Sequence, residues 1–189
     1  MAMKRDQCLK VLARHRTDEV VVAVYTAAQE WTHISASDLN YTFIGAMGQG
    51  SSHALGIALG RPDRRVVILD GDGSLLMNLG TLVTIANAAP KNLVHCLCRN
   101  GTYETNGAVA TPGGDIVSFT GFARDAGYRR TCTFDRLEDW DREAGGLLRE
   151  EGPIFVELRV EPGDHYPEDF ARLYDLEYRE RFRRALALS

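Results

Sequence analysis

Short apolar runs that alternate with helix-like segments constrain the fold of this 189-residue chain most strongly. Residues 19–24, 66–69 and 93–98 have the continuous, β-branched character of strands that are buried on both faces. Helical patterns fill the segments between them. Strands separated by helices imply βαβ units, so we expect an α/β domain of three layers, α/β/α, around a mostly parallel six-stranded sheet.

The remaining elements complete one domain over residues 1–189. The sequence predicts three further strands and a series of helices, with strands near 41–44, 129–133 and 153–160, and helices near 3–15, 26–31, 51–60, 72–89, 117–126 and 136–150. An amphipathic helix is expected at about 167–187, either docked on its own domain or packed on a partner chain.

Composition excludes several classes of function. A net charge of -4 gives no electrostatic footprint for nucleic acid, and no apolar run of membrane-spanning length occurs. The amino-terminal stretch lacks the apolar core of a signal peptide, and the four cysteines make no CxxC pair. We therefore expect buried free thiols in a cytoplasmic protein that contacts neither nucleic acid nor a membrane.

Three loops follow predicted strands, and they carry the residues of interest. Open parallel sheets bind ligands beyond the carboxyl ends of their strands, which is where residues 45–50, 71–74 and 99–102 fall. In the second loop, Gly71 and Gly73 allow a sharp turn and a close approach to a ligand, while Asp72 brings a carboxylate to the strand end. An Asp in such a turn also commonly hydrogen-bonds only its own backbone, so the loop alone does not decide its role.

The three loops together favour a metal-bridged diphosphate. Asp72 offers a carboxylate, Asn100 an amide oxygen and Thr102 a backbone carbonyl, a set of oxygen donors that suits Mg²⁺. A helix that begins just after Gly73 and Ser74 would present backbone N–H groups to an anion.

These motifs resemble the signature of the thiamine diphosphate-dependent enzymes. The resemblance rests on Gly71-Asp72-Gly73-Ser74, on Asn100, which follows 28 positions after Asp72, and on Gly45-Ala46-Met47-Gly48. It covers roughly residues 18–160. It implies the diphosphate-binding domain of the thiamine diphosphate fold, with thiamine diphosphate and Mg²⁺ as cofactors. A dinucleotide-binding fingerprint is disfavoured because the glycines of residues 45–50 stand in the wrong order.

The resemblance also implies roles for single residues. Asp72, Asn100 and Thr102 would be the metal ligands, Gly71, Gly73 and Ser74 would border the diphosphate, and Gly48 and Tyr103 would contact the cofactor. The Gly45 carbonyl would accept a hydrogen bond from the 4′-amino group of the aminopyrimidine. Met47 would wedge the cofactor into its bent form, with its N–H reaching the pyrimidine ring.

The same resemblance implies a missing part. Enzymes of this family need a glutamate from a separate pyrimidine-binding (PYR) domain, for which we find no room in the 189 residues. In residues 51–59, 71–80 and 100–105 the chain resembles the β subunit of sulfopyruvate decarboxylase and the carboxy-terminal half of phosphonopyruvate decarboxylase. We therefore expect a heteromer whose PYR-domain α subunit supplies the glutamate, and a decarboxylase that acts on a small 2-oxo acid. The alternatives are a carboligase subunit of the acyloin-forming or acetolactate synthase type, and a noncatalytic cofactor-binding subunit.

Residues that would contact the substrate are not fixed by sequence. Each of the following either faces the substrate or is an ordinary loop residue: Gln29, Tyr103, Glu104, Thr105 and Asn106. Arg99 stands where the family often has a second Asn, and so would add a cation beside the metal loop. His53 is expected to be a packed helix residue rather than a catalytic one.

Overall fold

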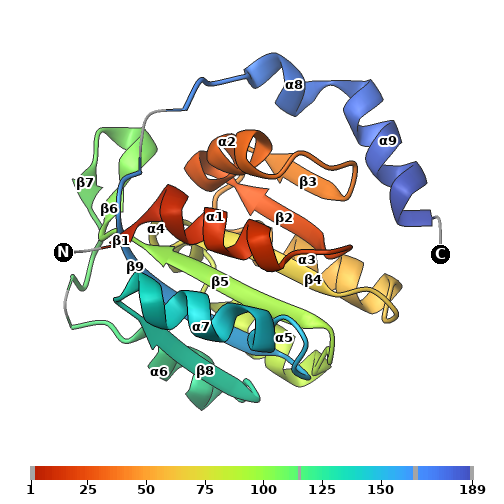
Figure 1. Ribbon diagram of the computed structural model, residues 1–189. Helices are drawn as coiled ribbons and strands as arrows, with labels where there is room; N and C mark the ends of the chain where they lie inside the picture. The colour runs from red at the N-terminus through yellow and green to blue at the C-terminus, as the bar shows by residue number, and fades with distance from the viewer. Residues whose placement is uncertain (1–2, 115, 164–165, 188–189) are drawn as a thin grey trace.

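The computed structural model describes residues 3–114, 116–163 and 166–187, which form a parallel sheet between two layers of helices (Figure 1). The long strands are β2 (Val20–Val24), β3 (Asn40–Phe43), β4 (Val66–Gly71), β5 (Leu93–Arg99), β8 (Arg130–Phe134) and β9 (Ile154–Glu161). Their order across the sheet is β3-β2-β4-β5-β9-β8, and every pairing in this sheet is parallel. The predicted three-layer parallel fold is therefore confirmed.

A two-residue strand, β1 (Met3–Lys4), is the seventh member of the sheet and was not predicted. It pairs with the last residues of β9, Val160 and Glu161, at the edge that β8 occupies farther back along β9. The helix expected at 3–15 consequently begins two residues later, as α1 (Arg5–His15). This pairing brings the start of α1 to the carboxyl edge of the sheet.

The helices bury one hydrophobic core on each face of the sheet. On one face, α1, α2 (Tyr25–Ile34) and α7 (Leu137–Leu147) enclose a core that contains Trp31 and Trp140. On the other, α3 (Gly50–Gly60), α5 (Gly80–Ala88) and α6 (Phe119–Ala126) cover a second core. Cys8, Cys96 and Cys98 are buried free thiols in the first core, as expected, and Cys132 is partly exposed.

The carboxy-terminal segment forms two helices, α8 (Phe170–Tyr174) and α9 (Leu176–Ala187), where one helix over about 167–187 was predicted. The break falls at Asp175, whose side chain accepts a hydrogen bond from the backbone N–H of Glu177 and so caps the start of α9. In Figure 1, α9 runs alongside the rest of the fold near β3, against which it buries Tyr178 and Phe182. Tyr178 and Arg179 donate hydrogen bonds to backbone carbonyls of Asn40 and Thr42 on this edge strand, so α9 docks on its own domain.

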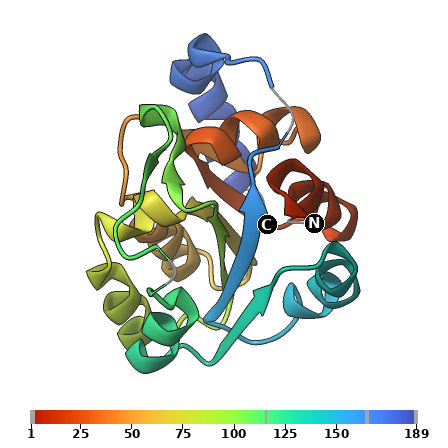
Figure 2. The ribbon, with the colours of Figure 1, turned by 90° about the vertical axis from the view of Figure 1, so that its left-hand side faces the viewer.

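Loops that follow the central strands gather at one end of the sheet. The short helix α4 (Asp72–Leu76) begins directly after β4, and a small antiparallel ribbon of β6 (Thr102–Tyr103) and β7 (Val109–Ala110) follows β5. The 3-10 helix η1 (Glu104–Asn106) connects these two strands. Figure 2 faces this carboxyl edge of the sheet, where the ribbon lies in front.

Candidate functional site

A cavity of about 50 Å³ lies where the loops after β2, β4 and β5 meet loop 45–48. Its walls contain most of the predicted site residues, namely Met47, Gly71, Asp72, Gly73, Ser74, Asn100, Thr102 and Tyr103. The other two, Gly45 and Gly48, lie in loop 45–48 itself. The topology thus brings three separated motifs to one place.

Asp72 is a buried carboxylate in the wall of this cavity, with 2% of its surface exposed. Its Oδ1 accepts a hydrogen bond from the backbone N–H of Gly73 at 3.0 Å, and its Oδ2 accepts one from the N–H of Gly101 at 2.8 Å. Burial raises the pKa of this carboxyl above its usual range, although both N–H groups act to lower it. A cation beside Asp72 would offset that burial penalty.

Asn100 faces the same cavity from the end of β5. Its Oδ1 accepts hydrogen bonds from the backbone N–H of Thr102 at 2.9 Å and from the Thr102 hydroxyl at 3.2 Å. Because Asp72 bonds to Gly101, the residue between Asn100 and Thr102, the two motifs are joined directly. The carboxylate of one loop and the amide of the other are adjacent, as the sequence predicted.

Charge at the cavity favours a divalent cation over a bare phosphate. The charged residues of its lining are Asp70, Asp72, Glu104 and Arg5, three carboxylates against one guanidinium. A diphosphate alone would be repelled by this excess of negative charge, whereas Mg²⁺ prefers carboxylate and amide oxygens. The donor set therefore fits a Mg²⁺-bridged diphosphate. The α4 helix is only five residues long, so its dipole adds little to anion binding.

Arg5 and Glu30 belong to this region and were missed by sequence reasoning. Arg5 bonds the Glu30 carboxylate at 3.0 and 2.8 Å and the Glu104 carboxylate at 2.5 and 3.1 Å. Burial acts to lower the pKa of Arg5, but the two carboxylates outweigh it and the pKa lies above its ordinary value. Glu104, which was a candidate to contact the substrate, is instead held by this arginine.

Gly73 packs closely against the ring of Tyr103 in the cavity wall. A Cβ atom on Gly73 would lie 2.6 Å from Cδ1 of the Tyr103 ring, a distance that no real side chain tolerates. Glycine is therefore required here by close packing. The ribbon after β5 is thus fitted directly onto the turn after β4.

Hydrogen bonds tie loop 45–48 to Ser74 of the second motif and to two further residues, Asn78 and Tyr25. The N–H of Gly48 donates to the Ser74 hydroxyl at 3.0 Å, and the Asn78 side chain donates to the Gly48 carbonyl at 3.1 Å. The N–H of Met47 donates to the Tyr25 hydroxyl at 3.1 Å. Gly45 and Gly48 have φ values of +91° and +80°, which explains why glycine is needed at both positions.

Tyr25 is a second residue that the sequence did not single out. It follows β2 directly and has a φ of +53°, a conformation that costs a non-glycine residue about 1–3 kcal/mol and that clusters at functional sites. The sequence signal that could have identified Tyr25 was its position directly after a buried parallel strand, where ligands of such sheets bind.

Other candidate residues point elsewhere. Arg99 donates hydrogen bonds to the buried Glu157 at 3.0 Å and to the Gly114 carbonyl at 2.6 Å, and its positive charge also acts to lower the pKa of Asp72. His53 stacks on Tyr41 with ring centroids 4.6 Å apart, as expected of a packed helix residue. Gln29 borders a neighbouring cavity of about 260 Å³, and Thr105 lines both that cavity and the candidate site, whereas Asn106 is exposed.

Sequence comparison relates the chain to decarboxylases. It is 36% identical over 144 residues to phosphonopyruvate decarboxylase of Streptomyces hygroscopicus, which covers 76% of this chain and 35% of that protein. It is 35% identical over 165 residues to sulfopyruvate decarboxylase subunit beta of Methanothermobacter thermautotrophicus, covering 87% of this chain and 85% of that one. The chain thus spans about a third of the first relative and most of the second.

Solved structures share the fold. Benzoylformate decarboxylase from Polynucleobacter necessarius superposes with a TM-score of 0.69 at 21% identity, over 85% of this chain and 34% of that one. The 4-hydroxybenzoylformate decarboxylase of Rhodococcus jostii RHA1 gives 0.69 at 22% identity, over 87% and 34%. The family model described as "Thiamine pyrophosphate enzyme, C-terminal TPP binding domain" matches residues 20–158. The chain therefore belongs to the thiamine pyrophosphate enzyme family, as a TPP-binding domain of the C-terminal type.

Proposed function

We propose that this chain is the cofactor-binding β subunit of a heteromeric, Mg²⁺-dependent thiamine diphosphate decarboxylase that acts on a small 2-oxo acid. The observation that carries the proposal is the junction of the buried Asp72 with the half-buried Gly101 and Asn100 at the meeting point of the three loops. The length of the match to the sulfopyruvate decarboxylase β subunit, 85% of that protein, supports a separate subunit. In the longer phosphonopyruvate decarboxylase, the matching region is about a third of one chain.

In this proposal each loop holds one part of the cofactor. Asp72, Asn100 and the Thr102 carbonyl bind Mg²⁺, and Gly71, Gly73 and Ser74 border the diphosphate. The Gly45 carbonyl and the Met47 N–H would contact the aminopyrimidine, and the Met47 side chain would support the cofactor. Gly48 and Tyr103 close the walls around it. Bound thiamine diphosphate supplies the electron sink that loss of CO₂ from a 2-oxo acid requires.

The hydrogen bonds already made by the acidic residues near the cavity support the proposal that a partner chain supplies the catalytic glutamate. Glu104 is bonded to Arg5 and Asn100, and Glu30 is bonded to Arg5. Asp72 accepts from two backbone N–H groups and lies at the metal end of the cavity. A glutamate for the pyrimidine ring would then come from a PYR-domain α subunit, with the active site between the two chains.

Assay of the complex purified from its native source tests this proposal. We expect CO₂ release from sulfopyruvate or phosphonopyruvate to require thiamine diphosphate, Mg²⁺ and a second polypeptide. Full activity of this chain alone would overturn the heteromeric assignment. Product formation that needs an added aldehyde would instead establish the carboligase alternative, and cofactor binding without turnover would establish the noncatalytic one.

Localisation is a separate matter. Within residues 3–114, 116–163 and 166–187, none of the helices has the length and apolar character needed to cross a membrane. The cytoplasmic location remains a prediction, which fractionation of the native cells would test.

A further inference from the structure

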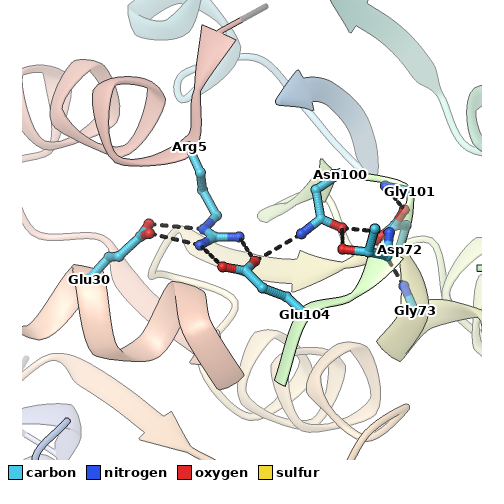
Figure 3. Close-up of polar contacts among 8 residues, drawn as sticks. Arg5, Glu30, Asp72, Gly73, Asn100, Gly101 and Glu104 are labelled. Carbon is cyan, nitrogen blue, oxygen red and sulfur yellow. Dashed lines mark hydrogen bonds and ion pairs between the residues drawn. The ribbon is translucent and has the colours of Figure 1, made fainter. Parts of the chain in front are cut away.

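Glu104 stands between a buried arginine and the amide of Asn100 (Figure 3). Its Oε2 accepts a hydrogen bond from Asn100 Nδ2 at 2.9 Å and another from Arg5 Nη1 at 2.5 Å. Its Oε1 accepts from Arg5 Nη2 at 3.1 Å. Glu104 therefore joins α1, through Arg5, to the proposed metal loop.

Arg5 is itself fixed from the opposite side. Glu30 of α2 receives two of its hydrogen bonds, and the side chains of Arg5 and Glu30 are 5% and 2% exposed. A bidentate pair buried to this extent holds the guanidinium in one orientation. The other edge of the guanidinium, formed by Nη1 and Nη2, then fixes the Glu104 carboxylate.

An asparagine amide has one end that can bind a metal and one that cannot. Only Oδ1 can coordinate Mg²⁺, whereas Nδ2 carries hydrogens and can only donate. A carboxylate can only accept, so Glu104 selects the nitrogen end of the Asn100 amide. The N–H and hydroxyl of Thr102 select the oxygen end. In Figure 3 the nitrogen is turned toward Glu104 and the oxygen lies on the side of Asp72.

We infer that Glu104 is a positioning residue that orients the Asn100 oxygen toward the metal, and that Arg5 and Glu30 hold Glu104 for this task. The inference rests on the proposed assignment of Asn100 as a Mg²⁺ ligand. Groups that orient metal ligands typically contribute 10- to 100-fold to metal affinity. They act without touching the metal.

A double-mutant cycle separates orientation from a merely structural role. The readout is the Mg²⁺ concentration that half-saturates thiamine diphosphate binding, measured by calorimetry on the complex that contains the full chain. Glu104→Gln keeps the size of the side chain, but its NH₂ group faces either Arg5 or Asn100, both of which donate. We expect this variant to raise the half-saturating concentration by about tenfold.

Asn100→Asp removes the need for orientation because both carboxylate oxygens can bind the metal. In that background, Glu104→Gln also replaces a repelling carboxylate by an amide that can donate to Asp. We therefore expect the double variant to bind Mg²⁺ at least as tightly as Asn100→Asp alone. An equal loss in both backgrounds, or no binding in either Asn100→Asp protein, would overturn the inference.

Two further variants complete the design. Asn100→Ala tests the ligand assignment itself, and an unchanged Mg²⁺ dependence in this variant would refute that part of the proposed function. If Asn100→Ala weakens Mg²⁺ binding but Glu104→Gln leaves it unchanged, only the positioning role is refuted. Asp141→Asn breaks an exposed ion pair of 2.8 Å between Asp141 of α7 and Arg14, which lies on α1 together with Arg5. This control should leave Mg²⁺ binding unchanged.

Discussion

The two ends of the cavity are built in different ways. At the proposed metal end, Asp72 is buried and Asn100 is half-buried. Hydrogen bonds anchor them within their loops, across the loops from Gly101 to Asp72, and from Asn100 to Glu104. At the other end, Gly45 is exposed, and Met47 and Gly48 fasten loop 45–48 by hydrogen bonds to Tyr25, Ser74 and Asn78. This difference supports the proposal that the chain supplies the diphosphate end of the site and that a partner completes the pyrimidine end.

Loss of the Asp72 carboxylate should have the largest effect. In Asp72→Ala the metal site loses its proposed anionic ligand, and the N–H groups of Gly73 and Gly101 lose their acceptors. We expect affinity for thiamine diphosphate with Mg²⁺ to fall by on the order of a hundredfold or more, with the far-ultraviolet circular dichroism preserved. Calorimetry would measure the affinity, and a change of less than threefold would place the metal elsewhere.

Gly73→Ala should strain the same end through packing. The new methyl group would lie 2.6 Å from the Tyr103 ring, so the ribbon after β5 must shift. Overpacking of this kind costs about 1–3 kcal/mol in the free energy of unfolding, which denaturant titration would measure. In a Tyr103→Ala background the same substitution should cost much less. If the two losses are simply additive, the contact does not limit the site.

Met47→Ala should affect turnover rather than metal binding, since Met47 lies at the pyrimidine end. Shortening the side chain removes the proposed support for the bent cofactor, so we expect kcat of the complete complex to fall by about tenfold or more. The Mg²⁺ concentration needed for half-saturation should change little. A variant in which metal affinity falls as steeply as kcat would show that the two ends are not independent.

The sequence predicted that the loops carrying Asp72 and Asn100 would meet, and the structure brings them together. Asp72 and Asn100 each follow a buried strand, and neighbouring parallel strands end at the same edge of the sheet. The β4–β5 pairing therefore sufficed to bring them together. The sequence also marked Gly45, Gly48 and Gly73, and the structure supplies a separate backbone or packing reason for each.

Arg5 was not predictable in the same way. An arginine at the start of an amphipathic helix is typical of a solvated surface, and its partner Glu104 lies 99 residues away. Arg5 reaches the site only because the two-residue strand β1 pairs with the end of β9, a pairing too short to leave a pattern in the sequence. The break at Asp175 was missed because a capping Asp within a charged helical segment resembles any other surface residue.

Tyr25→Phe should have the smallest effect on cofactor affinity, and its sign should be opposite to that of the substitutions at the metal end. Removal of a hydrogen-bond partner at the metal end should weaken cofactor binding, but Tyr25→Phe should strengthen it. The Tyr25 hydroxyl accepts from the Met47 N–H, the group proposed to contact the pyrimidine ring, so the hydroxyl competes with the cofactor for this donor.

A neutral hydrogen bond contributes about 0.5–1.5 kcal/mol, so Tyr25→Phe should raise thiamine diphosphate affinity by roughly two- to tenfold. The stability of the cofactor-free protein should fall by a similar free energy. Inorganic diphosphate with Mg²⁺ provides the matched control, because it lacks the pyrimidine and its affinity should not change. If Tyr25→Phe alters both ligands equally, the hydroxyl acts on the metal end, and the division of the cavity into two independent ends fails.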